Sequence, residues 1–230
     1  MPIIDVIIPA YNEEASIGLV VSELLRQPVR DVIVCNNNSR DHTELVARDA
    51  GGIVVMERRP GYGSACLRGM AYIAERPRQS WPDVVVFIDG DHSDHPEELP
   101  DLIRPITEGN YDLVIGSRTR GELEPGSMTP PQVFGNWLAT NLIRLFYRYD
   151  FTDLGPFRAI RYPVLRELGM RDPDFGWTVE MQVRAAKAGL RCIEVPVRYR
   201  NRIGTSKISG TVRGTILAGH KILWTIFKLL

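Results

Sequence analysis

Apolar and polar residues alternate along this chain in two distinct rhythms. Short apolar runs, typical of buried strands, are separated by stretches in which apolar residues recur every three or four positions, as on one face of a helix. The runs that predict strands lie at residues 3–8, 32–35, 53–56, 84–88, 113–115 and 192–197. The patterns that predict the first helices lie at residues 17–25, about 43–50, 64–75 and 96–106. This alternation predicts an α/β fold with a Rossmann-like, mostly parallel central sheet flanked by helices.

Two helical stretches further along are strongly apolar. Residues 133–146 predict a helix that belongs to the core or faces an apolar partner, and shorter helices follow at 164–168 and 178–188. Residues 215–230 are mainly apolar but contain His220, Lys221 and Lys228, and they fall short of the ~20 apolar residues of a membrane span. We expect residues 211–230 to form an amphipathic helix that lies on a membrane. Packing on its own domain or on a second subunit is the alternative.

The charge balance and the cysteines narrow the choice of partners and compartment. The 230 residues carry 28 Lys and Arg and 28 Asp and Glu, so no overall field recruits nucleic acid. Cys35, Cys66 and Cys192 are widely separated among apolar neighbours, which predicts neither a disulfide framework nor a metal site. The N-terminus enters a predicted strand without the features of a signal peptide. We therefore expect a cytoplasmic protein, peripheral at the cytoplasmic face of a membrane.

The run at 84–88 ends in two acids, Asp89 and Asp91, with only Gly90 between them. A buried strand followed by carboxylates brings them to the C-terminal edge of the sheet, where α/β proteins bind their ligands. Mg²⁺ or Mn²⁺ takes oxygen ligands and shares them with phosphates, so such a cation bridging the acids to a diphosphate is the simplest countercharge. Residues 172–174 repeat the Asp-x-Asp spacing, but no apolar run precedes them, and we interpret them as a loop.

Three other predicted strands end in loops that suit a nucleotide. Tyr11 follows the first strand in a tight turn, and residues 36–41 follow the second with amide and hydroxyl groups that match a base edge. Residues 58–64 follow the third strand with two arginines and two glycines before a helix, a composition that cradles phosphate. Each loop by itself is as well explained as an ordinary turn. Their common position beside Asp89 and Asp91 favours a nucleotide site.

The chain resembles the inverting glycosyltransferases of family 2, and within them the polyprenyl-phosphate (dolichyl-phosphate) mannosyl- and glucosyltransferases. The resemblance covers nearly the whole chain and rests on the order of its motifs. These lie at residues 8–14, 37–43, 61–63 with Gly69, 89–97, 116–118, 153–159, 194–197 and 202–207. Three positions depart from the family pattern: Asn36 and Asn37 stand where acids are common, and Ser93 stands where close relatives often have a glutamine metal ligand.

The resemblance implies a GT-A catalytic domain over residues 1–210, a nucleotide-sugar donor and a Mg²⁺ or Mn²⁺ ion held by Asp89 and Asp91. It implies a donor site formed by Pro9, Ala10, Tyr11, Glu13, Asn37, Gly61, Asp89, Gly90 and Asp91. It also implies groups around the acceptor and the phosphates: Arg118, Arg158, Arg202, Ser206 and Lys207. The implied enzyme moves a hexose from GDP-mannose or UDP-glucose to polyprenyl phosphate, with inversion at the anomeric carbon. A homo-oligomer or a membrane partner protein is compatible with this interpretation.

Two acids are candidates for a general base. A lipid monophosphate is already ionised near neutral pH and needs no strong base, whereas a hydroxyl acceptor does. Glu180 and Asp153 are the candidates for that role. Together with Asp91 and Arg118 they form the predicted catalytic set. Helix capping or ion pairing explains either acid equally well. A soluble family 2 enzyme with a hydroxyl acceptor, and a nucleotide-sugar-binding module without turnover, are the alternatives.

Overall fold

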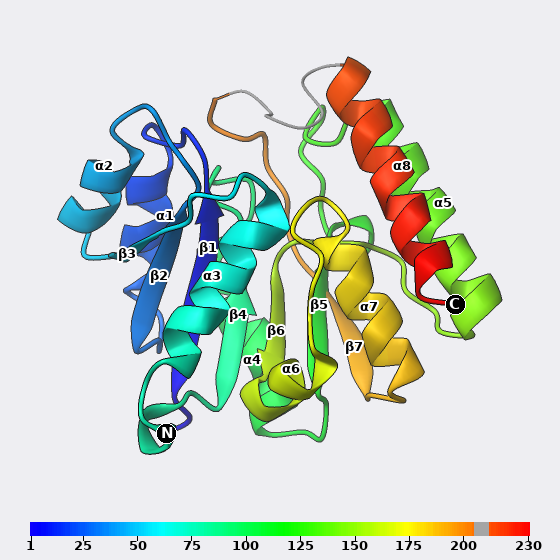
Figure 1. Cartoon of the computed structure of the whole chain (residues 1–230), viewed down its shortest axis with the longest axis horizontal. Helices are drawn as coiled ribbons and strands as arrows, with labels where there is room; N and C mark the ends of the chain where they lie inside the picture. The colour runs from blue at the N-terminus through cyan, green and yellow to red at the C-terminus, as the bar shows by residue number, and fades with distance from the viewer. Residues whose placement is uncertain (205–211) are drawn as a thin grey trace.

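The computed structural model describes residues 1–204 and 212–230, the side chains of 212–216 excepted. In these residues seven strands form one sheet in the order β3-β2-β1-β4-β6-β5-β7. Their bounds are β1 Ile4–Ala10, β2 Asp31–Asn36, β3 Ile53–Met56, β4 Val84–Phe87, β5 Leu113–Ser117, β6 Arg158–Arg161 and β7 Cys192–Pro196. The helices are α1 Ile17–Leu24, α2 Thr43–Asp49, α3 Tyr62–Ala74, α4 Leu99–Thr107, α5 Pro130–Tyr147, α6 Tyr162–Leu168, α7 Trp177–Lys187 and α8 Val212–Lys228 (Figure 1).

The sheet is mostly parallel, as the sequence predicts. Strands β3, β2, β1 and β4 run parallel to one another, and β5 runs parallel to β7. The exception is β6, which pairs antiparallel with both β4 and β5. No strand is predicted there, because Arg158–Arg161 is short and has charged residues at both ends. Pairing with β4 and β5 makes this segment a strand, although its sequence pattern does not predict one.

Two apolar cores lie on opposite faces of the sheet, and β4 shows how they are divided. Val85 and Phe87 face the core that is covered by α3, α5, α6 and α7, whereas Val84 and Val86 face the core under α1, α2 and α4. Phe87 meets Trp177 edge to face, with ring centroids 5.7 Å apart. Burying a side chain such as Phe87 contributes about 1.5–3 kcal/mol. The same alternation directs Asp89, two residues further on, toward α3.

Helices α5 and α8 pack side by side at one end of the sheet (Figure 1). On their inner side Ile226 is fully buried, and the Tyr147 hydroxyl donates a hydrogen bond to the Ile226 carbonyl. The exposed rings of Phe146 and Phe227 join the two helices, with their centroids 5.5 Å apart. The outer side, called the α5–α8 face below, exposes Val133, Phe134, Trp137, Leu145, Leu217, Trp224 and Phe227. None of the described helices combines the length and the apolar character needed to cross a membrane.

Candidate active site

A pocket of about 840 Å³ opens at the C-terminal ends of β1, β2 and β4. Loops that follow parallel strands meet at this edge of an α/β sheet. The pocket is lined by all nine residues that the sequence assigns to the donor: Pro9, Ala10, Tyr11, Glu13, Asn37, Gly61, Asp89, Gly90 and Asp91. Arg202 reaches the same wall from beyond β7. The four predicted strand ends therefore contribute to one cavity, as their positions in the sequence imply.

Asp89 and Asp91 lie at the base of this pocket with different partners. Asp89 accepts a hydrogen bond from the Tyr62 hydroxyl at 3.0 Å. Asp91 accepts hydrogen bonds from the Ser93 amide at 3.0 Å and from Ser93 Oγ at 2.6 Å, and its Oδ2 lies 2.8 Å from Arg202 Nη1. Burial, followed by the charge of Asp91, raises the pKa of Asp89 to about 6. The single positive charge of Arg202 therefore does not balance the two carboxylates.

These residues fit a divalent cation. Two carboxylates separated by one glycine supply the hard oxygen ligands that Mg²⁺ and Mn²⁺ take, and the raised pKa of Asp89 is the mark of an acid that lacks a sufficient countercharge. Ser93 is fully buried, and its hydroxyl donates a hydrogen bond to Asp91. Its position therefore suits orientation of the Asp91 carboxylate. The glutamine that it replaces in the resembled family is a metal ligand.

Asn37 shapes the pocket wall through its side chain. Its Nδ2 donates to the carbonyls of Glu57 and Arg59, at 3.2 and 2.7 Å, and its Oδ1 accepts from the Gly61 amide at 2.8 Å. The amide group is therefore committed to the loop that follows β3. This geometry gives Asn37 a scaffolding role and does not present its side chain to a base edge.

The glycines at the start of α3, Gly61 and Gly63, serve another purpose than the predicted phosphate cradle. A Cβ atom at Gly61 would lie 2.2 Å from the Pro173 carbonyl oxygen, and one at Gly63 would lie 2.0 Å from that of Asp172. The Ser64 amide donates to the Pro173 carbonyl at 2.8 Å. The start of α3 thus receives residues 172–173, and one of its free amides is already bound. Gly61 nevertheless lines the pocket.

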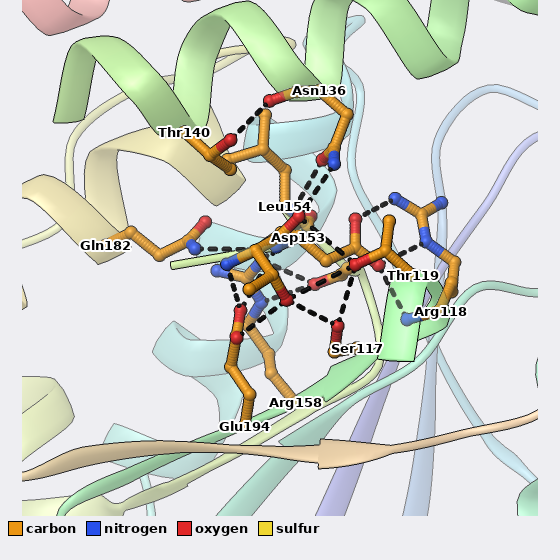
Figure 2. Close-up of polar contacts among 12 residues, drawn as sticks. Ser117, Arg118, Thr119, Asn136, Thr140, Asp153, Leu154, Arg158, Gln182 and Glu194 are labelled. Carbon is orange, nitrogen blue, oxygen red and sulfur yellow. Dashed lines mark hydrogen bonds and ion pairs between the residues drawn. The ribbon is translucent and has the colours of Figure 1, made fainter. Parts of the chain in front are cut away.

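Arg118 and Asp153 form a buried bidentate ion pair beside the pocket (Figure 2). Asp153 is fully buried; its Oδ1 accepts from Arg118 Nη2 at 2.7 Å, and its Oδ2 accepts from Arg118 Nε and from the Arg118 amide, both at 2.8 Å. The Arg118 guanidinium also lies over the ring of Tyr199, 5.0 Å from its centroid. Both oxygens of Asp153 are occupied, so the structure does not present this acid as a free base.

Arg158 is held inside the protein. Its guanidinium donates to the carbonyls of Leu154, Gly155 and Thr178, each at 3.0 Å, and the residue is completely buried (Figure 2). It does not line the pocket. The guanidinium N–H groups of Arg158 bind main-chain carbonyls and thereby link the turn after Asp153 to α7. This arrangement does not support the predicted contact of Arg158 with phosphate.

Glu180 is also committed to the fold. It is buried, and its Oε2 accepts hydrogen bonds from the amides of Arg171 and Asp172 at 3.0 and 2.6 Å. Its Oε1 pairs with Arg184 Nε at 2.8 Å. Glu180 therefore anchors the loop before α7, which is the helix-end role that the sequence leaves open beside general-base catalysis. Of the predicted phosphate-binding cluster, Arg202 lines the pocket, whereas Ser206 and Lys207 lie outside the described residues.

The family model described as Glycosyl transferase family 2 matches residues 5–169, which is more than half of the chain. The chain belongs to glycosyl transferase family 2. The matched segment runs from the second residue of β1 to beyond β6 and contains all nine residues of the predicted donor wall.

Relatives of this family 2 glycosyltransferase are similar over most of their length. An uncharacterised glycosyltransferase of Mycobacterium tuberculosis is 36% identical over 94% of each chain. An undecaprenyl-phosphate mannosyltransferase of Micrococcus luteus is 31% identical, over 90% of this chain and 88% of its own. Among solved structures, glucosyl-3-phosphoglycerate synthase of M. tuberculosis, in complex with Mn²⁺, UDP and phosphoglyceric acid, superimposes with a TM-score of 0.77 at 23% identity. That match covers 99% of this chain and 78% of the synthase. The likeness supports the GT-A fold.

Tyr62 and Phe175 line the pocket of this glycosyltransferase but are not in the predicted donor set. Tyr62 holds Asp89, and Phe175 lines the pocket from a loop more than 80 residues beyond the acid pair. Tyr62 stands between Gly61 and Gly63, so its place beside a predicted donor residue was a usable signal. Phe175 follows the second Asp-x-Asp, which the sequence marks as a loop and the structure confirms as one. Nothing in the local pattern connects that loop with the donor pocket.

Proposed function

We propose that this family 2 glycosyltransferase is an inverting hexosyltransferase that moves a sugar from GDP-mannose or UDP-glucose to a polyprenyl phosphate. The reaction would take place at the cytoplasmic face of a membrane. The choice of acceptor rests on one observation: the carboxylates of both predicted bases are already paired within the protein. Asp153 is paired through both oxygens with Arg118, and Glu180 is bound by two amides and Arg184.

A phosphate acceptor does not need either acid. The second pKa of a phosphomonoester is about 6, so its oxygen is already a nucleophile near neutral pH. A hydroxyl acceptor must lose a proton in the reaction, and either predicted base, Asp153 or Glu180, would have to be released from its partners to accept it. Breaking a buried ion pair leaves an uncompensated charge and costs ~3–5 kcal/mol. The arrangement of Asp153 and Glu180 therefore favours an acceptor that is ionised before it binds.

The proposed transfer is a single displacement. An oxygen of the acceptor phosphate forms a bond to the anomeric carbon while the bond from that carbon to the donor diphosphate breaks, and the electron pair leaves with the nucleoside diphosphate. Arg202, which lines the pocket beside Asp91, is placed to pair with the diphosphate as its charge grows. Arg118, held by Asp153, is the predicted contact of the acceptor phosphate. No proton needs to be moved for this substrate pair.

A divalent cation completes the proposed site. Asp89 and Asp91 would hold Mg²⁺ or Mn²⁺, which when bound neutralises charge on the leaving diphosphate. The Mn²⁺ and UDP in the structure of glucosyl-3-phosphoglycerate synthase support this assignment by analogy of fold. The undecaprenyl-phosphate mannosyltransferase of Micrococcus luteus, at 31% identity, supports the lipid phosphate acceptor.

The α5–α8 face supports a membrane location. It exposes Trp and Phe side chains on two adjacent helices, neither of which contains Asp or Glu. Arg144 in α5 and Lys228 in α8 are exposed, so their charge is suited to an anionic lipid surface. We propose that this face, rather than α8 alone, rests on the lipid headgroups. Replacing both Trp137 and Trp224 by Ser should reduce sedimentation with phosphatidylglycerol vesicles, while nucleotide binding stays unchanged. Equal sedimentation of the two proteins would contradict this assignment.

An acceptor assay tests the proposed chemistry directly. The full chain is incubated with Mn²⁺, with GDP-mannose or UDP-glucose, and with undecaprenyl phosphate or 3-phosphoglycerate in parallel. We expect radiolabelled sugar in the lipid fraction with undecaprenyl phosphate, and none after Asp91→Asn or after EDTA. Transfer to 3-phosphoglycerate with no transfer to the lipid would reject the proposed acceptor and leave the family assignment intact.

A further inference from the structure

The loop of residues 171–176 connects the C-terminal helix with the donor pocket. It joins α6 to α7 and contains the second Asp-x-Asp of the sequence, Asp172-Pro173-Asp174. Figure 1 shows this yellow segment between α3 and α8. Contacts with α3, α7 and α8 hold this loop in place.

Toward the pocket, the loop docks on the start of α3. The Pro173 carbonyl accepts from the Ser64 amide at 2.8 Å and from Ser64 Oγ at 3.1 Å. The glycines at 61 and 63 permit this approach, since a side chain at either position would collide with the loop backbone. Beneath the loop, Glu180 binds its first two amides. This docking places Phe175 in the wall of the donor pocket.

Toward α8, the loop is held by the Asp172 carboxylate. Its Oδ2 lies 3.1 Å from Lys221 Nζ and 3.4 Å from Thr225 Oγ1, while its Oδ1 accepts from the Asp174 amide at 2.8 Å. A Cβ atom at Gly176 would lie 2.3 Å from Thr225 Oγ1, so a glycine is needed for α8 to approach the loop this closely. One carboxylate thus joins α8 to the turn that carries Phe175.

We infer that Phe175 is a donor-positioning residue, and that α8 holds it in place through the contact of Lys221 with Asp172. The side chain of Phe175 is half-buried and presents an apolar surface in a pocket that Tyr11 and Met56 also line. Such a surface suits the flat, apolar face of a nucleotide base or the carbon face of a sugar. The inference rests on the donor site of the proposed function and is independent of the proposed acceptor.

The consequence is a coupling between two distant parts of the chain. If docked α8 stabilises the loop position that binds donor, bound donor must stabilise the docking of α8 by the same free energy. Loss of the Lys221 contact should therefore weaken nucleotide binding, although Lys221 does not line the pocket. A purely structural helix would change thermal stability and leave nucleotide affinity alone.

Nucleotide binding tests both parts of the inference. Titration calorimetry with UDP and with GDP, each in Mn²⁺ buffer, would compare wild type with Phe175→Leu, Asp172→Asn and Lys221→Met. The matched control is Lys228→Met, since Lys228 is an exposed lysine in the last turn of the same helix. We expect affinity to fall about threefold to tenfold in the first three variants and to stay unchanged in the control. Unchanged affinity in Phe175→Leu would overturn its assigned role.

Hydrogen exchange provides a readout that does not depend on the nucleotide. The Ser64 amide, which is bound to Pro173, and the Asp174 amide, which is bound to Asp172, should exchange faster in Asp172→Asn and Lys221→Met than in wild type or Lys228→Met. If exchange and affinity are both unchanged in these two variants, the coupling is refuted. If wild type binds neither UDP nor GDP, the proposed donor class and the role of Phe175 both fail, while the exchange result still decides whether α8 holds the loop.

Discussion

Arg202 occupies one oxygen of Asp91: its Nη1 lies 2.8 Å from Oδ2, and the Ile203 amide donates to the Asp91 carbonyl at 2.9 Å. The other oxygen, Oδ1, is bound by Ser93. A divalent cation that binds Oδ2 of Asp91 therefore competes with the arginine for that oxygen. We predict that Arg202→Met binds Mn²⁺ more tightly than wild type without nucleotide, by about tenfold or ~1.4 kcal/mol. Electron paramagnetic resonance of free Mn²⁺ measures this affinity.

The same substitution should act in the opposite direction on the complete substrate. Once the diphosphate is bound, Arg202 gains an anionic partner, so its loss should weaken binding of the Mn²⁺-nucleotide complex. Arg198→Met is the matched control, because Arg198 pairs with Glu97 and Glu98 and does not line the pocket. Mn²⁺ binding that is equal or weaker in Arg202→Met would show that the arginine does not compete for Asp91.

We expect Asp153 to stabilise the folded protein through its ion pair with Arg118. Asp153→Asn removes a fully buried charge that is paired with Arg118, and the remaining guanidinium loses its partner. We predict a loss of ~3–5 kcal/mol in the free energy of unfolding, measured by urea denaturation. Asp150→Asn is the control, since its pair with Arg144 is largely exposed and contributes ~0–1 kcal/mol. A stable Asp153→Asn variant without activity would instead support the predicted role as a base.

The sequence predicts those parts of the fold that depend on local patterns. Residues 84–88 are apolar without interruption, and the strand they form is buried on both faces, so its position follows from the sequence alone. Strand β6 is different, because Ala159 and Ile160 are too few to mark a strand between two arginines. Its existence depends on pairing with β4 and β5, which lie about 70 and 40 residues earlier in the chain.

The candidate site shows the same division. Strand ends place Asp89, Asp91 and the loops near Tyr11 and Gly61 around one pocket, and this convergence follows from parallel topology. The roles of single polar side chains do not follow. Arg158 lies in a motif on which the family resemblance rests, and Glu180 is a predicted general base, yet in the folded chain both bind main-chain groups. A motif records residue types in order, whereas a hydrogen-bond partner depends on tertiary contacts.

The pKa of Asp89 predicts a pH dependence of metal binding. Burial and then the charge of Asp91 raise this pKa from 3.8 to about 6. The folded chain therefore keeps a proton that the unfolded chain releases, so this group favours folding below about pH 4, and that contribution is lost as the pH rises through 6. Metal binding needs the ionised form. We expect the affinity for Mn²⁺ to fall by about fivefold between pH 6 and pH 5, because the ionised fraction of Asp89 falls by that factor. Asp89→Asn should weaken binding and flatten this profile; an equally steep profile would assign the titration to another group.

Gly63 tests whether the start of α3 depends on the loop of residues 171–176. A methyl group at this position would lie 2.0 Å from the Asp172 carbonyl oxygen, and main chain cannot yield as a flexible side chain does. We predict that Gly63→Ala lowers the free energy of unfolding by ~1–3 kcal/mol and weakens nucleotide binding, because the loop must move away with Phe175. Gly135→Ala is the control: no atom lies within 4 Å of its added Cβ, and alanine within α5 should stabilise the protein by ~0.5–1 kcal/mol. Urea denaturation and nucleotide titration of the two variants would separate steric displacement of the loop from a general effect of replacing glycine. If Gly63→Ala matched Gly135→Ala in both measurements, the loop would not be seated against α3 as the structure has it.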